Sequence, residues 1–74
     1  MNGKILGERI RMLRHQQKMG QGQLAREMEI TGNSLWQLEH EKIADPHLSR
    51  LTKAMAIFHV SADYLLGVTD DSHA

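Results

Sequence analysis

Apolar residues recur at helical spacing along the chain, and short polar stretches separate one group from the next. Leu6, Ile10 and Leu13 are spaced four and three residues apart, which predicts an amphipathic helix that ends near residues 17–18. A second apolar group within residues 24–28 predicts another helix, of only about nine residues. The first third of the chain is therefore predicted to fold as two helices.

A third helix is expected at residues 32–40. Thr31 precedes it and is a good N-cap, because its hydroxyl can accept a backbone N–H of the first turn. Only Leu35 and Leu38, three residues apart, are expected to face the core. A narrow apolar edge with a wide polar face is what a helix needs when it must enter the major groove of DNA.

The clearest helical period lies in residues 48–58. Its apolar positions, all expected to face the core, are Leu48, Leu51, Ala54, Met55 and Phe58. Asp45 and Pro46 predict the start of this helix, as an N-cap followed by proline at the first helical position.

Ser61 is expected to cap a last short helix, which Gly67 ends. The sequence has no internal repeat and no β-hairpin pattern. It predicts an all-α domain of five short helices over residues 1–67, followed by a flexible C-terminal tail at 68–74.

Composition limits the classes of protein that fit. A chain of 74 residues without cysteine must hold one small core by packing alone, without disulfides or thiolate metal sites. No apolar run is long enough for a signal peptide or a membrane span, so a cytoplasmic protein without a membrane partner is expected.

The net charge is zero, but the charges are unevenly distributed along the sequence. Six basic residues and one acid lie in residues 1–26, whereas three basic residues and eight acids follow. Such a division can turn a basic side towards a polyanion such as DNA. The alternative is that two oppositely charged surfaces only keep the domain soluble.

Catalytic and metal-site patterns are missing from the sequence. The five histidines do not form a pair at i and i+4 with a third ligand nearby, and His40-Glu41 is not continued into a zinc-protease motif. No nucleophile constellation and no phosphate-binding glycine loop are present. We expect no enzyme, no metal and no cofactor.

The joint spacing of several segments resembles the Cro and C1-type repressors, the XRE family of helix-turn-helix domains. The matching segments are Leu6 to Arg14, Gln21 to Ala25, Ile30 to Glu39, Lys42 and Leu48 to Leu66. The resemblance covers about 60 residues in register and implies a compact five-helix, lambda-repressor-like fold. It also implies a sequence-specific regulator of transcription that binds double-stranded DNA, typically a repressor acting as a homodimer on a pseudopalindromic operator.

The resemblance also assigns roles to individual positions. Contacts to DNA bases are implied for Gly32, Asn33, Ser34, Trp36 and Gln37. Contacts to DNA phosphates are implied for Gln21, His40, Lys42 and His47. A structural ion pair between the first and third helices is implied for Arg14 and Glu39.

Four positions depart from the family pattern. Glu29 stands where a glycine usually adopts a left-handed conformation, which would cost it about 1 kcal/mol or more. Glu41 replaces another common glycine and adds an acid beside the expected phosphate path. Gly32 removes a side chain from a usual base-reading position, and Gly22 is a poor helix former.

Trp36 leaves a second function open. Its position points outward, and an exposed tryptophan on a small domain often marks a contact surface; the alternative is a ring folded over the core. Together with the neutral charge, Trp36 favours a protein-interaction module on the same scaffold, of the antitoxin or antirepressor type. That module would have a protein partner.

Overall fold

The computed structural model describes residues 3–40 and 48–72. The described part contains the helices α1 (Gly3–Gln16), α2 (Gln21–Met28), α3 (Gly32–His40), α4 (Leu48–Phe58) and α5 (Ala62–Leu65). The predicted all-α class with five short helices is confirmed. None of these helices, within the described ranges, has the length and the apolar character that a membrane crossing requires.

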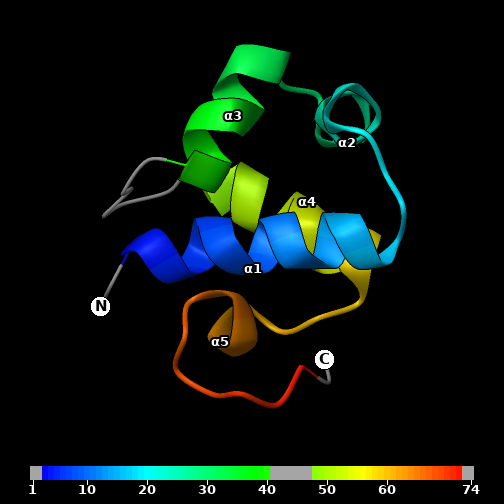
Figure 1. Cartoon of the computed structure of the whole chain (residues 1–74). Helices are drawn as coiled ribbons and strands as arrows, with labels where there is room; N and C mark the ends of the chain where they lie inside the picture. The colour runs from blue at the N-terminus through cyan, green and yellow to red at the C-terminus, as the bar shows by residue number, and fades with distance from the viewer. Residues whose placement is uncertain (1–2, 41–47, 73–74) are drawn as a thin grey trace.

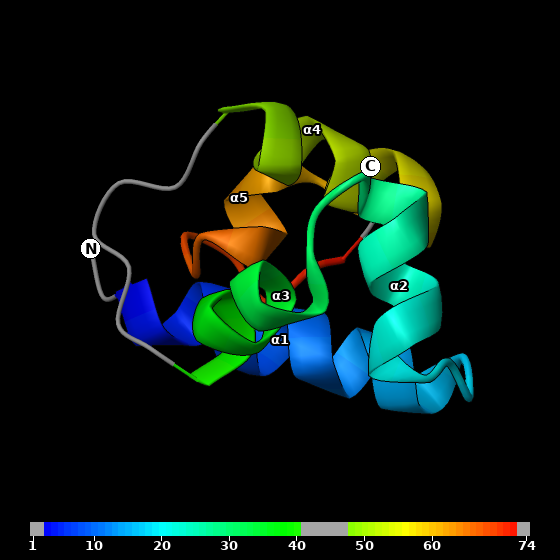
Figure 2. The same ribbon diagram turned by 90° about the horizontal axis from the view of Figure 1, so that it is seen from above.

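The helix α1 runs through the middle of the molecule and separates two groups of elements (Figure 1). On one side it packs against α3, which in turn packs against α2. On the other side it packs against α5, and α4 connects the two groups by contacting both α2 and α5. Seen from above, α3 lies across α1 with α2 beside it (Figure 2). The adjacent helices α2 and α3 form the helix-turn-helix pair.

All five helices contribute to one apolar core. Its fully buried large side chains are Ile10, Leu24, Met28, Leu35, Leu38 and Leu65. Most of the positions expected from the helical period are in this core. Leu48 is the exception, because it is 72% exposed at the first residue of α4, where the helix has not yet reached the core.

Three helices end at a residue in the left-handed conformation that is not glycine. These residues are Lys18, Glu29 and His59, with φ of 56°, 60° and 55°. After each of them the chain continues with a backbone hydrogen bond back into the helix, such as that from Ile30 N–H to Ala25 O at 3.0 Å. Glu29 thus adopts the strained geometry that its alignment with a glycine suggested, at a cost of about 1 kcal/mol.

The predicted caps of α3 and α5 are present. The Thr31 hydroxyl accepts the Ser34 backbone N–H at 3.0 Å, and the Ser61 hydroxyl accepts that of Tyr64 at 3.1 Å. Gly67 follows α5 with φ +82°. The predicted cap at residues 45–46 lies outside the described residues.

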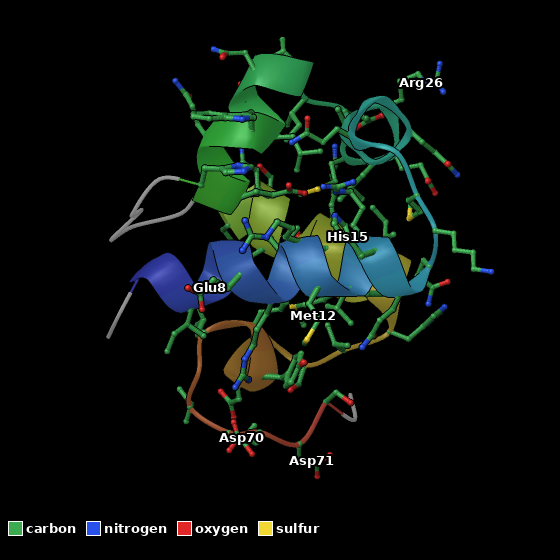
Figure 3. The ribbon with its side chains drawn as sticks, viewed as in Figure 1. Glu8, Met12, His15, Arg26, Asp70 and Asp71 are labelled. Atoms are coloured by element: carbon green, nitrogen blue, oxygen red, sulfur yellow. The ribbon has the colours of Figure 1, made fainter. Side chains whose placement is uncertain are left out.

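The segment after α5 lies below that helix in Figure 3, where Asp70 and Asp71 are labelled. Arg9 of α1 donates hydrogen bonds to Thr69 O at 2.7 Å and to the Asp70 carboxylate at 2.7 Å. These contacts concern only the beginning of the 68–74 tail, whose flexibility stays a prediction.

Candidate nucleic-acid interface

The inner face of α3 is fixed to the rest of the protein by close packing. Leu35 and Leu38 are buried, as the sequence predicts, and Glu39 beside them is only 3% exposed. α1 approaches the end of α3 at Gly7, where an added Cβ would lie 2.3 Å from Leu38 O and 2.7 Å from Glu39 O. The two backbones are therefore in contact, and only glycine fits at this crossing.

A buried ion pair joins α1 to α3 at the positions that the family resemblance implies. Arg14 Nε donates to Glu39 Oε2 at 2.8 Å, and Arg14 Nη2 donates to Glu39 Oε1 at 3.1 Å. Arg14 Nη1 also donates to Met19 O at 3.0 Å. A two-point contact of this kind fixes the orientation of both side chains, and through them the angle of α3 on α1.

Gln21 begins α2, and its side chain lies in this same network. Its Nε2 donates to Glu39 Oε1 at 3.3 Å, so that the buried carboxylate receives three hydrogen bonds. Sequence reasoning assigned Gln21 to a DNA phosphate and missed this bond to Glu39. The phosphate contact stays a prediction, which the side-chain carbonyl and the N-terminus of α2 would make.

The first turn of α3 is open on its outer side. Gly32 and Asn33 are exposed, and a Cβ added at Gly32 would meet no atom within 4 Å. The Ser34 hydroxyl accepts a hydrogen bond from Thr31 Oγ1 at 2.9 Å, so it takes part in the helix cap. The base contact predicted for Ser34 would have to coexist with that bond.

The second turn of α3 continues the exposed face with Trp36, Gln37 and His40. Trp36 is 47% exposed, and its ring stacks on that of His40, with centroids 4.6 Å apart and planes 9° from parallel. The indole is therefore not folded over the core, which was the alternative. Asn33 and Gln37 have no side-chain hydrogen bond to any other described residue.

The predicted base-contact residues thus lie on one outward face of α3, with Ser34 at its edge. His40 lies on the same face, one turn after Trp36. Gln21 is directed towards Glu39 instead. Lys42 and His47, the other predicted phosphate contacts, lie outside the described residues.

The charges are distributed differently in space than along the sequence. Arg9 and Arg14 of the basic N-terminal third are paired with Asp70 and Glu39 from the acidic remainder. Lys53 of α4 is likewise paired with Glu29. The basic excess counted in residues 1–26 is therefore partly cancelled by the pairing of Arg9 and Arg14 with acids from later in the chain.

Among the described side chains, four arginines and lysines have no ion pair with another described residue, namely Arg11, Lys18, Arg26 and Arg50. Arg26 of α2 is exposed, and Figure 3 shows it pointing away from the rest of the protein. Sequence reasoning did not single out Arg26. Its position on the first helix of the helix-turn-helix pair, away from the apolar residues of α2, was the signal available.

Comparison with known proteins agrees with this architecture. A family model described as a helix-turn-helix domain matches residues 7–70. The chain belongs to this family, which confirms the resemblance to Cro and C1-type domains. It is also 38% identical over 64 residues to the uncharacterized HTH-type transcriptional regulator YobD of Bacillus subtilis, covering 86% of this chain and 56% of that protein.

Solved structures of SinR are similar in fold. The N-terminal DNA-binding domain of SinR from Bacillus subtilis has a TM-score of 0.77 at 25% identity, with 96% of this chain and 99% of that chain covered. SinR in complex with DNA has a TM-score of 0.73 at 26% identity, covering 82% of this chain and 97% of that one.

A complex of SinR with SinI also contains a similar chain. The TM-score is 0.74 at 26% identity, and the match covers 82% of this chain and 59% of that chain. The present chain thus spans little more than half the length of YobD and of the SinR/SinI match.

Proposed function

We propose that this protein is a sequence-specific, double-stranded-DNA-binding regulator of transcription, with α3 inserted in the major groove. Asn33 and Gln37 would contact base edges, because an amide can pair in a bidentate manner with adenine N6 and N7. Gly32, Ser34 and Trp36 would complete the base contacts, while Gln21, His40, Lys42 and His47 would contact phosphates. The protein would act by binding, without catalysis, in the cytoplasm at the nucleoid.

The outward face of α3 is the single observation that carries this proposal. Asn33, Trp36 and Gln37 are exposed on it, whereas the opposite face is held by two leucines and a buried ion pair. A helix held rigidly on one side and open on the other is suited to reading a groove. Membership in the helix-turn-helix family and the similarity to DNA-bound SinR support the same function.

We further propose that the protein acts as a homodimer and that it represses transcription. One copy of α3 offers few base contacts, and a second copy would double them on a pseudopalindrome with half-sites about one helical turn apart. The dimer would repress transcription by occupying its operator. Its oligomeric state is measured by sedimentation with and without the selected duplex.

A selection from random duplexes at low salt tests the function. We expect a defined sequence to be enriched, and its affinity to fall with salt with a logarithmic slope of about −0.9 per phosphate contact. Gln37→Ala should lose discrimination at one base position, by about 1 to 3 kcal/mol, while non-specific binding persists. The absence of any enriched duplex would overturn the proposal.

A second candidate is a protein-interaction module of the antitoxin or antirepressor type. The 47% exposed Trp36 favours it, as does the similarity to a SinR chain solved in complex with SinI. This module would bind a protein with fixed stoichiometry, and its binding would not change when Gln21 and Lys42 are replaced. If both residues contact phosphates as proposed, their replacement should weaken DNA binding, so the two functions make opposite predictions for the same variants.

A further inference from the structure

On the outer face of α3, Trp36 and His40 form a stacked pair that a hydrogen bond holds in place. The two residues lie one helical turn apart, and their rings are 4.6 Å apart and 9° from parallel. His40 Nδ1 also lies 3.1 Å from Trp36 O. A carbonyl oxygen can only accept, so this hydrogen bond requires a proton on Nδ1. The bond fixes the plane of the imidazole, and the imidazole in turn supports the indole.

This support decides the conformation of the indole before any ligand arrives. One side of the Trp36 ring is covered by His40, yet the residue is still 47% exposed. The indole Nε1 has no hydrogen bond to any described residue. An exposed tryptophan without such support would lose rotamer freedom on binding, whereas the stacked ring has already lost it. The pair therefore presents a fixed apolar surface on the same exposed face of α3 as Asn33 and Gln37.

An apolar surface at this position has one chemical match in the major groove. Each base pair presents hydrogen-bond donors and acceptors there, and only thymine adds an apolar group, the C5 methyl. The helix α3 carries no arginine or lysine, the side chains that read guanine by two hydrogen bonds. Its outer face is thus suited to A·T pairs, with the amides for adenine and the indole for thymine.

We propose that Trp36, held by His40, determines specificity by contacting thymine methyl groups in the major groove. This inference rests on the proposed DNA-binding function. Trp36 is the residue in contact, and His40 is a positioning residue whose effect on base choice passes through the indole.

Replacement of thymine by deoxyuridine in the selected duplex tests this directly, because it removes the methyl group and leaves the base pairing unchanged. We expect one or two thymines in each half-site to be sensitive to this substitution. At each of them, the loss of the methyl group should weaken binding of the unchanged protein by about fourfold, the effect of one buried methyl group. For Trp36→Ala the same substitutions should have no effect. Gln37→Ala is the matched control on the neighbouring exposed position and should keep the full sensitivity to the methyl group.

The positioning role of His40 has its own readout. His40→Ala should reduce the ratio of thymine to deoxyuridine affinity, and His40→Phe should restore it, because phenylalanine keeps a ring to stack on. A lost phosphate contact would weaken binding to both duplexes equally and would leave this ratio unchanged. Trp36 is the only tryptophan of the chain, so its fluorescence should also change when the duplex is added.

Two results would overturn the inference. One is that replacing thymine by deoxyuridine at no position of the selected duplex changes the affinity of the unchanged protein. The other is that Trp36→Ala keeps the loss of affinity that the unchanged protein shows. Both results can be obtained only after a duplex has been selected. They therefore differ from a selection that enriches no duplex, which would overturn the DNA-binding function itself. Indole fluorescence that changes with a protein partner and not with DNA would equally contradict thymine recognition. All variants lie at exposed positions, and their unfolding curves show whether the fold is retained.

Discussion

The two sides of α1 are held by the same two kinds of residue, an arginine and a glycine, in different ways. Towards α3, Arg14 pairs with Glu39, and Gly7 allows contact between backbones. Towards α5, Arg9 donates a hydrogen bond to Tyr64 O near the end of that helix, and Gly67 faces Ile5 of α1. α1 thus connects α3, the helix proposed to read DNA, to the C-terminal part of the domain.

The arginines differ most in their acidic partners. The Glu39 side chain is 0% exposed and the Arg14 side chain 11% exposed. Each charge is therefore shielded from water and is stabilised mainly by the other. Asp70 is 99% exposed and is hydrated whether or not Arg9 is present. Arg9 instead relies on the Tyr64 ring, 4.2 Å from its guanidinium carbon, and on the carbonyls of Tyr64 and Thr69.

The glycines differ in what opposes them. A Cβ at Gly7 would meet main-chain atoms of α3, which cannot move without moving the helix. A Cβ at Gly67 would lie 2.9 Å from Ile5 Cδ1, the end of a side chain that can change its conformation. The side of α1 that holds α3 is therefore the more rigid one. This is the requirement for a helix that must keep its angle in a groove.

The largest effect is expected for Arg14→Ala. Removing one partner of a buried pair leaves the other charge without compensation, so we expect stability to fall by about 3 kcal/mol. The double variant Arg14→Met with Glu39→Leu should regain most of this loss, because neither charge remains. Urea denaturation measures both effects. A loss below about 1 kcal/mol in Arg14→Ala would contradict the buried pair as described.

Gly7→Ala should come next, with a loss of about 2 kcal/mol from overpacking against α3. Alanine is the better helix former, so helix propensity alone would give a gain of about 1 kcal/mol. Gly22→Ala in α2 is the matched control, because no atom lies within 4 Å of its added Cβ, and it should be stabilising. Thermal unfolding compares the two. Equal gains would show that the α1–α3 backbone contact is absent.

Arg9→Ala should cost about 1 to 2 kcal/mol, from lost hydrogen bonds to carbonyls and the lost ring contact. Asp70→Asn should change stability by less than about 0.5 kcal/mol, because the carboxylate is exposed. Hydrogen exchange of the α5 amides should increase only in the first variant. If Asp70→Asn proved as damaging as Arg9→Ala, the exposed ion pair would be the main contact.

The smallest effect is expected at an exposed pair away from α1. The Lys53 ammonium, by its hydrogen bond and its charge, lowers the pKa of Glu29 below the ordinary value of 4.5. A carboxyl group with a lowered pKa stabilises the fold above its unfolded pKa and loses that contribution as the pH falls through the folded pKa. The stability difference between the unchanged protein and Glu29→Gln should thus shrink below pH 4.5. A difference independent of pH would contradict the pair.

Local features of the sequence were sufficient to predict most of the helices and part of the site. Helical spacing and two hydroxyl caps located α3 and α5, because caps and periodicity depend on residues that are neighbours in the chain. The same reasoning placed Asn33, Trp36 and Gln37 on the exposed face of α3. It did not anticipate that Leu48, in a perfect helical period, lies at the edge of the molecule.

The contacts between distant segments were decided by the tertiary structure. The sequence shows an excess of basic residues before residue 27, but packing pairs Arg9 and Arg14 with acids that lie far along the chain. Gly7 looks like an ordinary helical glycine until the backbone of α3 is seen against it. The sequence by itself therefore determined the helices and the face that α3 exposes, because these follow from local spacing. Only the tertiary structure decided how rigidly α3 is held, since that depends on atoms brought together by folding.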